Sequence, residues 1–301
     1  MNWEEEIEEF KEYLKLERGL TDNSVKAYVT GIEKLTDFLK ETDPEIAPET
    51  LSVDHMHGFM TWLGEKGISP RTQARIISGI KSFYKNLLLS EKMEEDPTAG
   101  MQTPKIGRKL PTVLSVEEIN AMEETCDMTR VEGVRNHAII ETLYSCGLRV
   151  TELTELKISN LHFEEGYVTV EGKGRKERIV PIGERAKREI KEYVENWRTE
   201  QNINDGQEDY VFINKLGDKI SRVMIFNIIK EATKAAGIEK IVSPHTLRHS
   251  FATHLVDGGA NLRAVQQMLG HESIMTTEIY THLDNTYLKS TLVNHHPYKE
   301  E

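Results

Sequence analysis

The sequence is poor in cysteine and in net positive charge. Only two cysteines, Cys126 and Cys146, occur among 301 residues, a scarcity that favours small buried thiols in a reducing cytosol over disulfides. The 50 acidic residues outnumber the 38 lysines and arginines, which gives a formal net charge of -12 and is unlike most small nucleic-acid binders. We therefore predict a cytoplasmic protein. Binding of a polyanionic partner such as DNA requires a local region of positive charge in this acidic sequence.

Long apolar runs and common cofactor motifs are also missing. No apolar run approaches the length that crosses a bilayer, and the acidic start Trp3-Glu4-Glu5-Glu6 is unlike a secretory signal. The sequence has no His-Glu-x-x-His pattern for a metal and no Gly-x-x-x-x-Gly-Lys-Ser/Thr loop for a nucleotide. We expect no membrane insertion, no metal site and no cofactor.

The first hundred residues carry four apolar stripes at helical spacing and no strand signal. The stripes are Trp3, Ile7, Phe10 and Leu14; Val25, Tyr28, Ile32, Leu35 and Leu39; Met56, Phe59, Met60 and Leu63; and Ile77, Ile80, Phe83, Tyr84 and Leu87. Helix starts are expected at Thr21 or Asp22, at Ser52 and at Ser69-Pro70, since hydroxyl and carboxylate side chains cap free amides. The pattern predicts a compact four-helix bundle over residues 1–104.

A basic, proline-bounded segment follows the bundle. Residues 105–111 follow Pro104 directly and end with Pro111, and they are predicted to be an inter-domain linker. Ser115 and Glu118 form a capping box that opens a second domain over residues 112–301. The fold class is therefore mainly α with a small antiparallel β-sheet, in two domains.

Charge is distributed unevenly along the predicted bundle. Residues 1–65 hold 6 basic and 16 acidic side chains, a balance of -10, whereas residues 66–92 hold 6 basic and 1 acidic, a balance of +5. On the fourth helix, one face collects basic and hydroxyl side chains at steps of three and four: Arg71, Arg75, Ser78, Ser82 and Lys85. Such a face suits a phosphate-lined groove, although an ordinary solvated helix face has the same composition.

Two cations of the second domain follow backbone breaks. Apolar spacing from Val134 to Tyr144 predicts a helix that ends at Gly147, so that Arg149 comes directly after the break. Residues 167–170 and 178–182 have the pattern of paired strands, and they flank the glycine-bounded turn of residues 172–176. The turn presents Lys173 at its tip.

The last sixty residues predict a run of short helices. Ser243-Pro244 starts a helix on which His245 and Arg248 lie three apart and share a face. The apolar stripe of that helix lies on another face, so the His/Arg pair is expected to point out of the core. A second helix should end at Gly270, a natural C-terminal glycine. His271 comes just past that end, and Tyr280 follows after one more short helical segment.

Each of these residues alone has an ordinary explanation. A single arginine or lysine is usually a solvated surface charge, a lone histidine is a polar or capping residue, and a tyrosine is half-buried packing. The combination is not explained in this way, because two histidines, two arginines, a lysine and a phenol fall on positions that the local structure does not need for packing the hydrophobic core. They could converge on one phosphate.

In this order, Arg149, Lys173, His245-x-x-Arg248, His271 and Tyr280 resemble the catalytic pattern of the tyrosine recombinases. The surrounding residues are similar to the Xer recombinases of bacteria, to the XerD group more than the XerC group. The motifs that carry the resemblance are residues 144–153 (YSCGLRVTEL), 172–178 (GKGRKER), 243–255 (SPHTLRHSFATHL) and the tail His295-His296-Pro297. The similarity covers nearly the whole chain, and it implies a SAM-like core-binding domain before the catalytic domain.

The resemblance implies a role for each residue. Tyr280 would attack a DNA phosphate to give a 3′-phosphotyrosyl link, and Arg149 and Arg248 would hold the non-bridging oxygens as charge builds. Lys173 would protonate the leaving 5′-oxygen, and His245 and His271 would transfer protons and contact the phosphate. The helix-4 residues named above, together with Lys105 and Arg175, are expected to contact DNA. No metal and no ATP are needed in this scheme.

The implied setting is resolution of chromosome dimers at a dif-like site during cell division. The expected partners are double-stranded DNA, a XerC-like recombinase in a heterotetramer or the chain itself in a homotetramer, and an FtsK-like DNA translocase. The tail from Leu283 to Glu301 has the polar composition of a fraying terminus, whereas the resemblance implies that a helix in it, carrying Leu288, Leu292 and Val293, docks on a neighbouring subunit. The alternatives are a phage or mobile-element integrase, a type IB topoisomerase and a non-catalytic DNA-binding protein.

Overall fold

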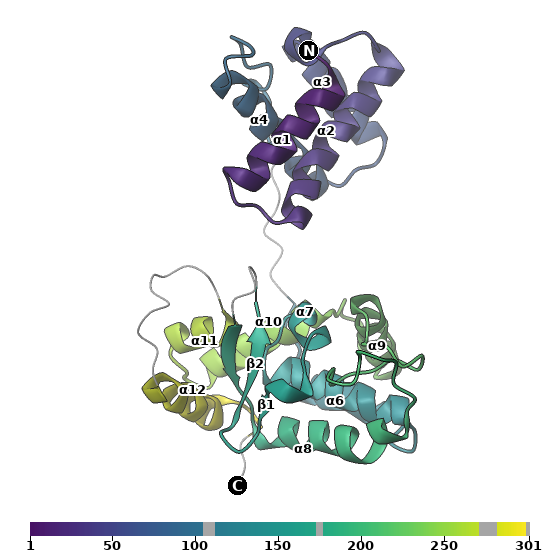
Figure 1. Cartoon of the computed structure of the whole chain (residues 1–301), viewed down its shortest axis with the longest axis vertical. Coiled ribbons are helices and arrows are strands. Elements are labelled where there is room, and N and C mark those ends of the chain that lie inside the picture. Colours follow the sequence, from purple (N-terminus) through teal and green to yellow (C-terminus); the bar gives the residue numbers. More distant parts are fainter. Residues whose placement is uncertain (105–111, 173–176, 271–281, 299–301) are drawn as a thin grey trace. The chain divides into compact units, whose positions relative to one another are not determined.

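The chain folds as two compact units, Met1–Lys109 and Leu110–Glu301 (Figure 1). The structure is a computed structural model that describes residues 1–104, 112–172, 177–270 and 282–298. Each unit has its own buried hydrophobic cluster. The two units therefore have separate hydrophobic cores, and the predicted linker of residues 105–111 lies outside the described residues.

The N-terminal unit is a bundle of four helices, as the apolar stripes predict. They are α1 (Trp3–Leu16), α2 (Asp22–Thr42), α3 (Val53–Glu65) and α4 (Pro70–Leu89), with a 3-10 turn at Pro48–Thr50. Ser52 and Ser69 cap α3 and α4 through their side chains, which explains why these helices begin where the sequence indicates. No strand occurs among residues 1–104.

Two glycines bring α2 and α4 into direct backbone contact. A Cβ added to Gly31 would lie 2.9 Å from the carbonyl oxygen of Ile76, and one added to Gly79 would lie 2.8 Å from that of Tyr28. Any side chain at either position would push the helices apart. The two helices therefore cross with their backbones in contact.

The C-terminal unit begins with the capping box predicted at Ser115. The amide of Ser115 donates to the Glu118 carboxylate at 2.7 Å, and the amide of Glu118 donates to the Ser115 hydroxyl at 3.2 Å. The helices of this unit are α5 (Val116–Glu124), α6 (Val131–Ser145), α7 (Val150–Thr154), α8 (Glu184–Glu192), α9 (Arg222–Ala235), α10 (Pro244–Asp257), α11 (Leu262–Leu269) and α12 (His282–His295). A π-helical turn at Tyr193–Trp197 extends α8.

The sheet has three antiparallel strands in the order β1-β2-β3. The two predicted strands are confirmed as β2 (Tyr167–Glu171) and β3 (Glu177–Pro181), in a register that pairs Glu171 with Glu177. The sequence pattern missed β1 (Leu161–His162) because two residues are too few to show an alternation. The strands on either side of Lys173 are thus paired up to Glu171 and Glu177.

The last helix packs on its own unit. Leu288 and Leu292 of α12 are 6% and 3% exposed and belong to the hydrophobic cluster of the C-terminal unit, whereas Val293 is 54% exposed. Leu288 and Leu292 thus pack in the core of their own unit in this structure, and docking of the tail on a neighbouring subunit stays a prediction. His296 is buried beyond the helix, among the rings of Tyr144, Phe251 and Tyr298.

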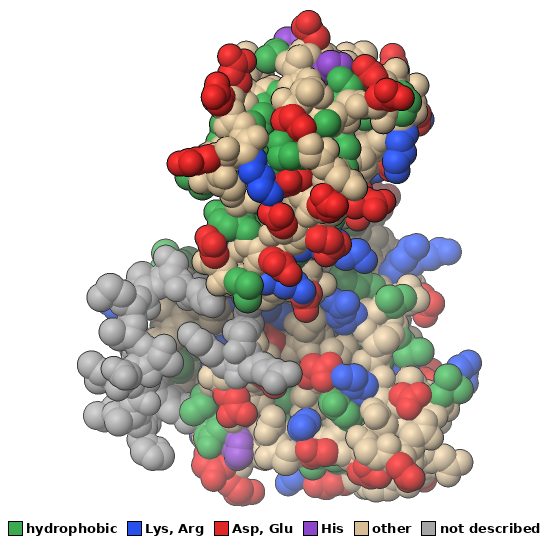
Figure 2. All heavy atoms as spheres, turned by 45° about the horizontal axis from the view of Figure 1, so that its top comes forward, with side chains coloured by type: hydrophobic (Ala, Val, Ile, Leu, Met, Phe, Trp, Pro, Cys, Tyr) green, Lys and Arg blue, Asp and Glu red, His purple; other side chains and the backbone are tan. Residues whose placement is uncertain are grey.

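The surfaces of the two units are mixed in charge. On the face drawn in Figure 2, acidic side chains are scattered over the N-terminal unit, as the balance of -10 over residues 1–65 predicts. No helix in the described parts of the chain is long and apolar enough to span a membrane.

Candidate active site

A glycine sets the position of the first predicted site arginine. Gly147 has a φ of +58°, and a Cβ there would lie 2.4 Å from the Phe251 ring of α10. Only glycine fits both the backbone conformation and the close approach. The break after α6 is thus pressed against α10, which brings the start of α7 beside the helix that carries Arg248.

Arg149 is the residue before α7, and it is anchored by a glutamate one turn later. The Glu152 carboxylate accepts from the Arg149 amide at 2.7 Å and from Arg149 Nη1 at 2.7 Å. The other terminal nitrogen of Arg149 donates to the Gly270 carbonyl at 2.9 Å. The Arg149 side chain is nevertheless 39% exposed, so its remaining N–H groups can meet a ligand from solvent.

Arg248 lies deeper than its helix pattern predicts. The residue is 6% exposed, and its guanidinium donates to the carbonyl of Gly147 at 2.7 Å and to the carbonyl of Leu269. Its Nη1 also lies 3.7 Å from the Glu152 carboxylate. The expectation that Arg248 points out of the core is wrong, because the end of α11 and the Gly147 turn cover that face and supply acceptors.

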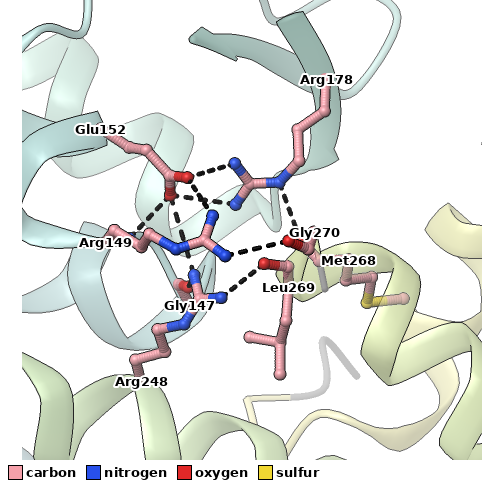
Figure 3. Close-up of polar contacts among 8 residues, drawn as sticks. All are labelled: Gly147, Arg149, Glu152, Arg178, Arg248, Met268, Leu269 and Gly270. Carbon is pink, nitrogen blue, oxygen red and sulfur yellow. Dashed lines mark hydrogen bonds and ion pairs between the residues drawn. The ribbon is translucent and has the colours of Figure 1, made fainter. Parts of the chain in front are cut away.

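Glu152 is the centre of this polar cluster, which consists of Glu152, Arg149, Arg178 and Arg248 (Figure 3). Its side chain is 1% exposed and it also accepts two hydrogen bonds from Arg178 of β3. One carboxylate among three guanidiniums leaves an excess of positive charge. The cluster is therefore suited to hold an anion with at least two bonding oxygens.

The protonation states of the cluster follow from burial and charge. Burial alone would raise the pKa of Glu152, but hydrogen bonds and charges from Arg178 and Arg149 outweigh it and hold that pKa below its ordinary value. Burial lowers the pKa of Arg248 to about 10, and repulsion from Arg149 acts in the same direction. Glu152 and Arg248 are thus both charged at neutral pH.

The other predicted site residues are placed less completely. His245 is exposed in the first turn of α10, which Ser243 and Thr246 cap through their side chains. Lys173, Arg175, His271, Tyr280 and Lys105 lie outside the described residues. The residue before His271 is fixed, however, because the Gly270 carbonyl is bonded to Arg149.

The predicted DNA-contact face of α4 lies on the surface of the N-terminal unit. Four of its members are exposed and Ser82 is half-buried, with Arg18 donating to its hydroxyl at 3.3 Å. A groove of about 300 Å³ runs between α2 and α4, where Arg75 is joined by Lys26 and Lys34. The sequence pattern of α4 gave no sign of Lys26 and Lys34, because only the packing of α2 against α4 brings them beside Arg75.

The cluster also holds two residues that the catalytic pattern does not contain, Glu152 and Arg178. The sequence carried one signal for Glu152: it lies three residues after Arg149 at a helix start, which is capping-box spacing. No pattern of neighbouring residues indicated that Arg178 belongs to the cluster, since its partner Glu152 lies 26 residues away in the sequence. Among the described residues, no group of three His, Cys, Asp or Glu side chains could hold a metal ion.

Comparison with known proteins gives a family for both units. The pattern of the Phage integrase family matches residues 112–286, and that of the phage integrase N-terminal SAM-like domain matches residues 7–91. The tyrosine recombinase XerD of Listeria monocytogenes is 40% identical over 291 residues, which are 97% of this chain and 98% of that protein. The likeness therefore extends over nearly the whole length of both chains.

Solved structures agree with this likeness. The XerA recombinase is 30% identical and covers 98% of this chain and 99% of its own, with a TM-score of 0.50. The XerH site-specific recombinase bound to its difH substrate is 23% identical, with a TM-score of 0.66 over 83% of this chain and 74% of that one. At that identity the second comparison supports the fold alone.

Proposed function

Since the chain belongs to the phage integrase family and is a site-specific tyrosine recombinase, we propose that Tyr280 is its nucleophile and that the arginine cluster is its phosphate site. The phenolic oxygen of Tyr280 forms a bond to a DNA phosphorus while the bond from phosphorus to the 5′-oxygen breaks. The phenol gives its proton to a base, for which His245, Lys173 and water are the candidates, and Lys173 gives a proton to the leaving oxygen. The product is a 3′-phosphotyrosyl link and a free 5′-hydroxyl.

The observation that carries this proposal is the pairing of Arg149 and Arg248 around buried Glu152. The two residues are 99 positions apart in sequence, yet both bind the same carboxylate and the carbonyls at the end of α11. Fixed guanidiniums stabilise charge as it develops on non-bridging oxygens, without reorganising during the reaction. His245 and His271 are proposed to transfer protons and contact the phosphate from the start of α10 and the segment after α11.

The energetics allow strand exchange without an external energy source. The phosphotyrosyl ester conserves the energy of the broken bond, so a 5′-hydroxyl from another duplex can reverse the step without ATP. Charge that a metal could otherwise supply comes here from two guanidiniums and an ammonium.

We further propose that double-stranded DNA is held on the surface of α2 and α4 around the groove between these helices. Arg71, Arg75, Ser78, Ser82 and Lys85 would face the backbone from α4, and Lys26 and Lys34 from α2. Lys105 and Arg175 are proposed as additional phosphate contacts. The acidic remainder of the N-terminal unit would weaken binding to random duplex, because it repels phosphate outside the groove.

The proposed biological setting is the cytoplasm of a dividing bacterium, where the enzyme would resolve chromosome dimers at a dif-like site. The identity to XerD proteins over nearly full length supports this role. A XerC-like recombinase or a second copy of this chain would complete a DNA-bound tetramer, and an FtsK-like translocase would activate it. A phage or mobile-element integrase with the same chemistry is the outcome if dif-like sites are not recombined.

A nicked suicide substrate tests the chemistry. The duplex carries a candidate dif-like site with a nick near the cleavage position, so that the short 5′-hydroxyl fragment diffuses away and the covalent complex accumulates. We expect a band of protein bound to DNA on a denaturing gel for the natural chain, none for Tyr280→Phe, and a yield about 10²–10³-fold lower for Arg149→Ala. Arg188→Ala, a surface arginine 66% exposed, is the matched control. A covalent band with Tyr280→Phe would overturn the nucleophile assignment.

A further inference from the structure

Arg178 of β3 is a third arginine in the cluster, and its contacts differ from those of Arg149 and Arg248. Its Nη1 and Nη2 donate to the two oxygens of Glu152, the second at 3.0 Å, in a two-point pairing (Figure 3). Its Nε donates to the Met268 carbonyl at 3.3 Å. The side chain is only 16% exposed. Arg178 is thus turned toward the protein, whereas Arg149 is turned partly toward solvent.

These contacts tie together three segments that are far apart in the sequence. Glu152 belongs to α7, Arg178 to β3, and Met268 to the end of α11. Gly270, with a φ of +62°, packs directly on Arg178: an added Cβ would lie 2.8 Å from its Cδ and Nε. The same Gly270 carbonyl accepts from Arg149. Arg178 therefore supports the backbone that immediately precedes His271.

The hydrogen-bond capacity of Glu152 shows what Arg178 changes for Arg149. A carboxylate offers about four acceptor positions. Arg178 occupies two of them, and the amide and Nη1 of Arg149 occupy the other two. Arg149 consequently gives one side-chain N–H to Glu152 and one to Gly270, out of about five that a guanidinium carries. The remaining N–H groups have no hydrogen-bond acceptor among the described residues.

We propose that Arg178 is a positioning residue for strand cleavage: it saturates Glu152 so that Arg149 keeps its outer N–H groups for the scissile phosphate. It also fixes the end of α11 against the sheet. Without Arg178, two acceptor positions of a buried carboxylate are open, and the adjacent Arg149 guanidinium turns inward to fill them. The phosphate then loses donors although both proposed catalytic arginines are still present. This inference rests on the proposed role of Arg149.

The test measures binding and chemistry separately on the nicked suicide substrate. For Arg178→Ala we expect the single-turnover rate of covalent complex formation to fall about 10²-fold, the size of effect that follows from misplacing a catalytic group by about 1 Å. The dissociation constant for the same duplex should stay within about threefold, since Arg178 is turned away from solvent. Arg188→Ala should change neither quantity by more than about twofold.

A conservative variant distinguishes geometry from charge. Arg178→Lys keeps the charge but cannot make the two-point pairing, so we expect it to remain at least about 30-fold slow. If Arg178→Ala does not fold, Arg178→Lys alone decides the question, with circular dichroism and DNA affinity as the checks on its fold. A lysine variant that cleaves within about threefold of the natural rate would overturn the proposal.

A double-mutant cycle tests whether Arg178 acts through Glu152. In a Glu152→Gln background, Arg178→Ala should lower the rate of covalent complex formation by less than about fivefold further, because the carboxylate that Arg178 saturates is already gone. If the rate loss of the double variant equals the product of the losses of the two single variants, positioning through Glu152 is refuted and Arg178 is assigned a direct contact with DNA. If the natural chain forms no covalent complex, or Tyr280→Phe forms one, the proposed function fails instead. If those controls behave and Arg178→Ala cleaves at the natural rate, only this inference fails.

Discussion

Glu152→Gln should destabilise the C-terminal unit by about 3 kcal/mol at pH 7. The carboxylate is 1% exposed and binds three guanidiniums, and removing one partner of a buried ion pair costs about 3–5 kcal/mol. The lower end applies because Arg149 is 39% exposed and regains hydration. The amide keeps the side-chain volume, so the loss reports charge and not a cavity.

The difference should depend on pH in a defined direction. The pKa of Glu152 is lowered in the folded protein, so its carboxylate contributes stability that is present above the unfolded-state pKa of about 4.5 and is lost as the pH falls below it. The gap between the natural chain and Glu152→Gln should therefore be constant from pH 7 to pH 6 and should narrow below about pH 4.5.

Urea unfolding followed by a single tryptophan measures this gap within one unit. The sequence has three tryptophans, and substituting Trp3→Phe and Trp62→Phe leaves Trp197 as the reporter of the C-terminal unit. Glu155→Gln is the control, because the only ion pair of this exposed residue within the described part of the chain is the surface pair with Lys219, so the change should cost less than about 1 kcal/mol. A gap below about 1 kcal/mol at pH 7, or one that widens in acid, would refute the reasoning.

Three further predictions use other contacts. Gly147→Ala should cost about 2–4 kcal/mol in the same urea assay, because its Cβ meets the Phe251 ring at a positive φ, whereas Gly183→Ala has open space and should cost less than about 1 kcal/mol. Lys26→Ala and Arg75→Ala should each reduce the slope of log Kd for duplex DNA against log salt by about 1, measured by fluorescence anisotropy; Lys11→Ala, which is paired with Glu8 on α1, should not. Burial, and then repulsion from Glu141, raise the pKa of Glu123 to about 9, so its stabilising proton is lost as the pH rises toward 9. Urea unfolding should show that the free energy of unfolding of Glu123→Gln rises relative to that of the natural chain between pH 7 and pH 9. An equal difference between the two proteins at both pH values would contradict this.

Local signals were sufficient for most of the secondary structure. Ser52, Ser69, Ser115 and Ser243 each cap the helix that the sequence predicts there, because a hydroxyl that satisfies a free amide acts within three residues. The two main strands were equally local, since they alternate on either side of a glycine turn. A two-residue strand such as β1 leaves no such pattern.

Burial of charge could not be predicted in the same way. The helical stripe treats Arg248 as solvent-facing, but its acceptors are Gly147, 101 residues away, and Leu269, 21 residues away. Arg178 is likewise defined by Glu152 and Met268, which only the tertiary fold brings to β3. The pattern of α12 fixes its apolar residues without saying whether they fill its own core or a partner's surface.

The central claim is that the Tyr280 oxygen becomes bonded to DNA, and peptide mapping of the trapped complex tests it most directly. Trypsin should release residues 264–289, a peptide that contains both Tyr280 and Tyr287, so fragmentation by mass spectrometry has to locate the nucleotide. The account predicts a nucleotide attached through its 3′-phosphate to Tyr280 alone. Attachment to Tyr287 or to any other residue, or through a 5′-phosphate, would contradict it.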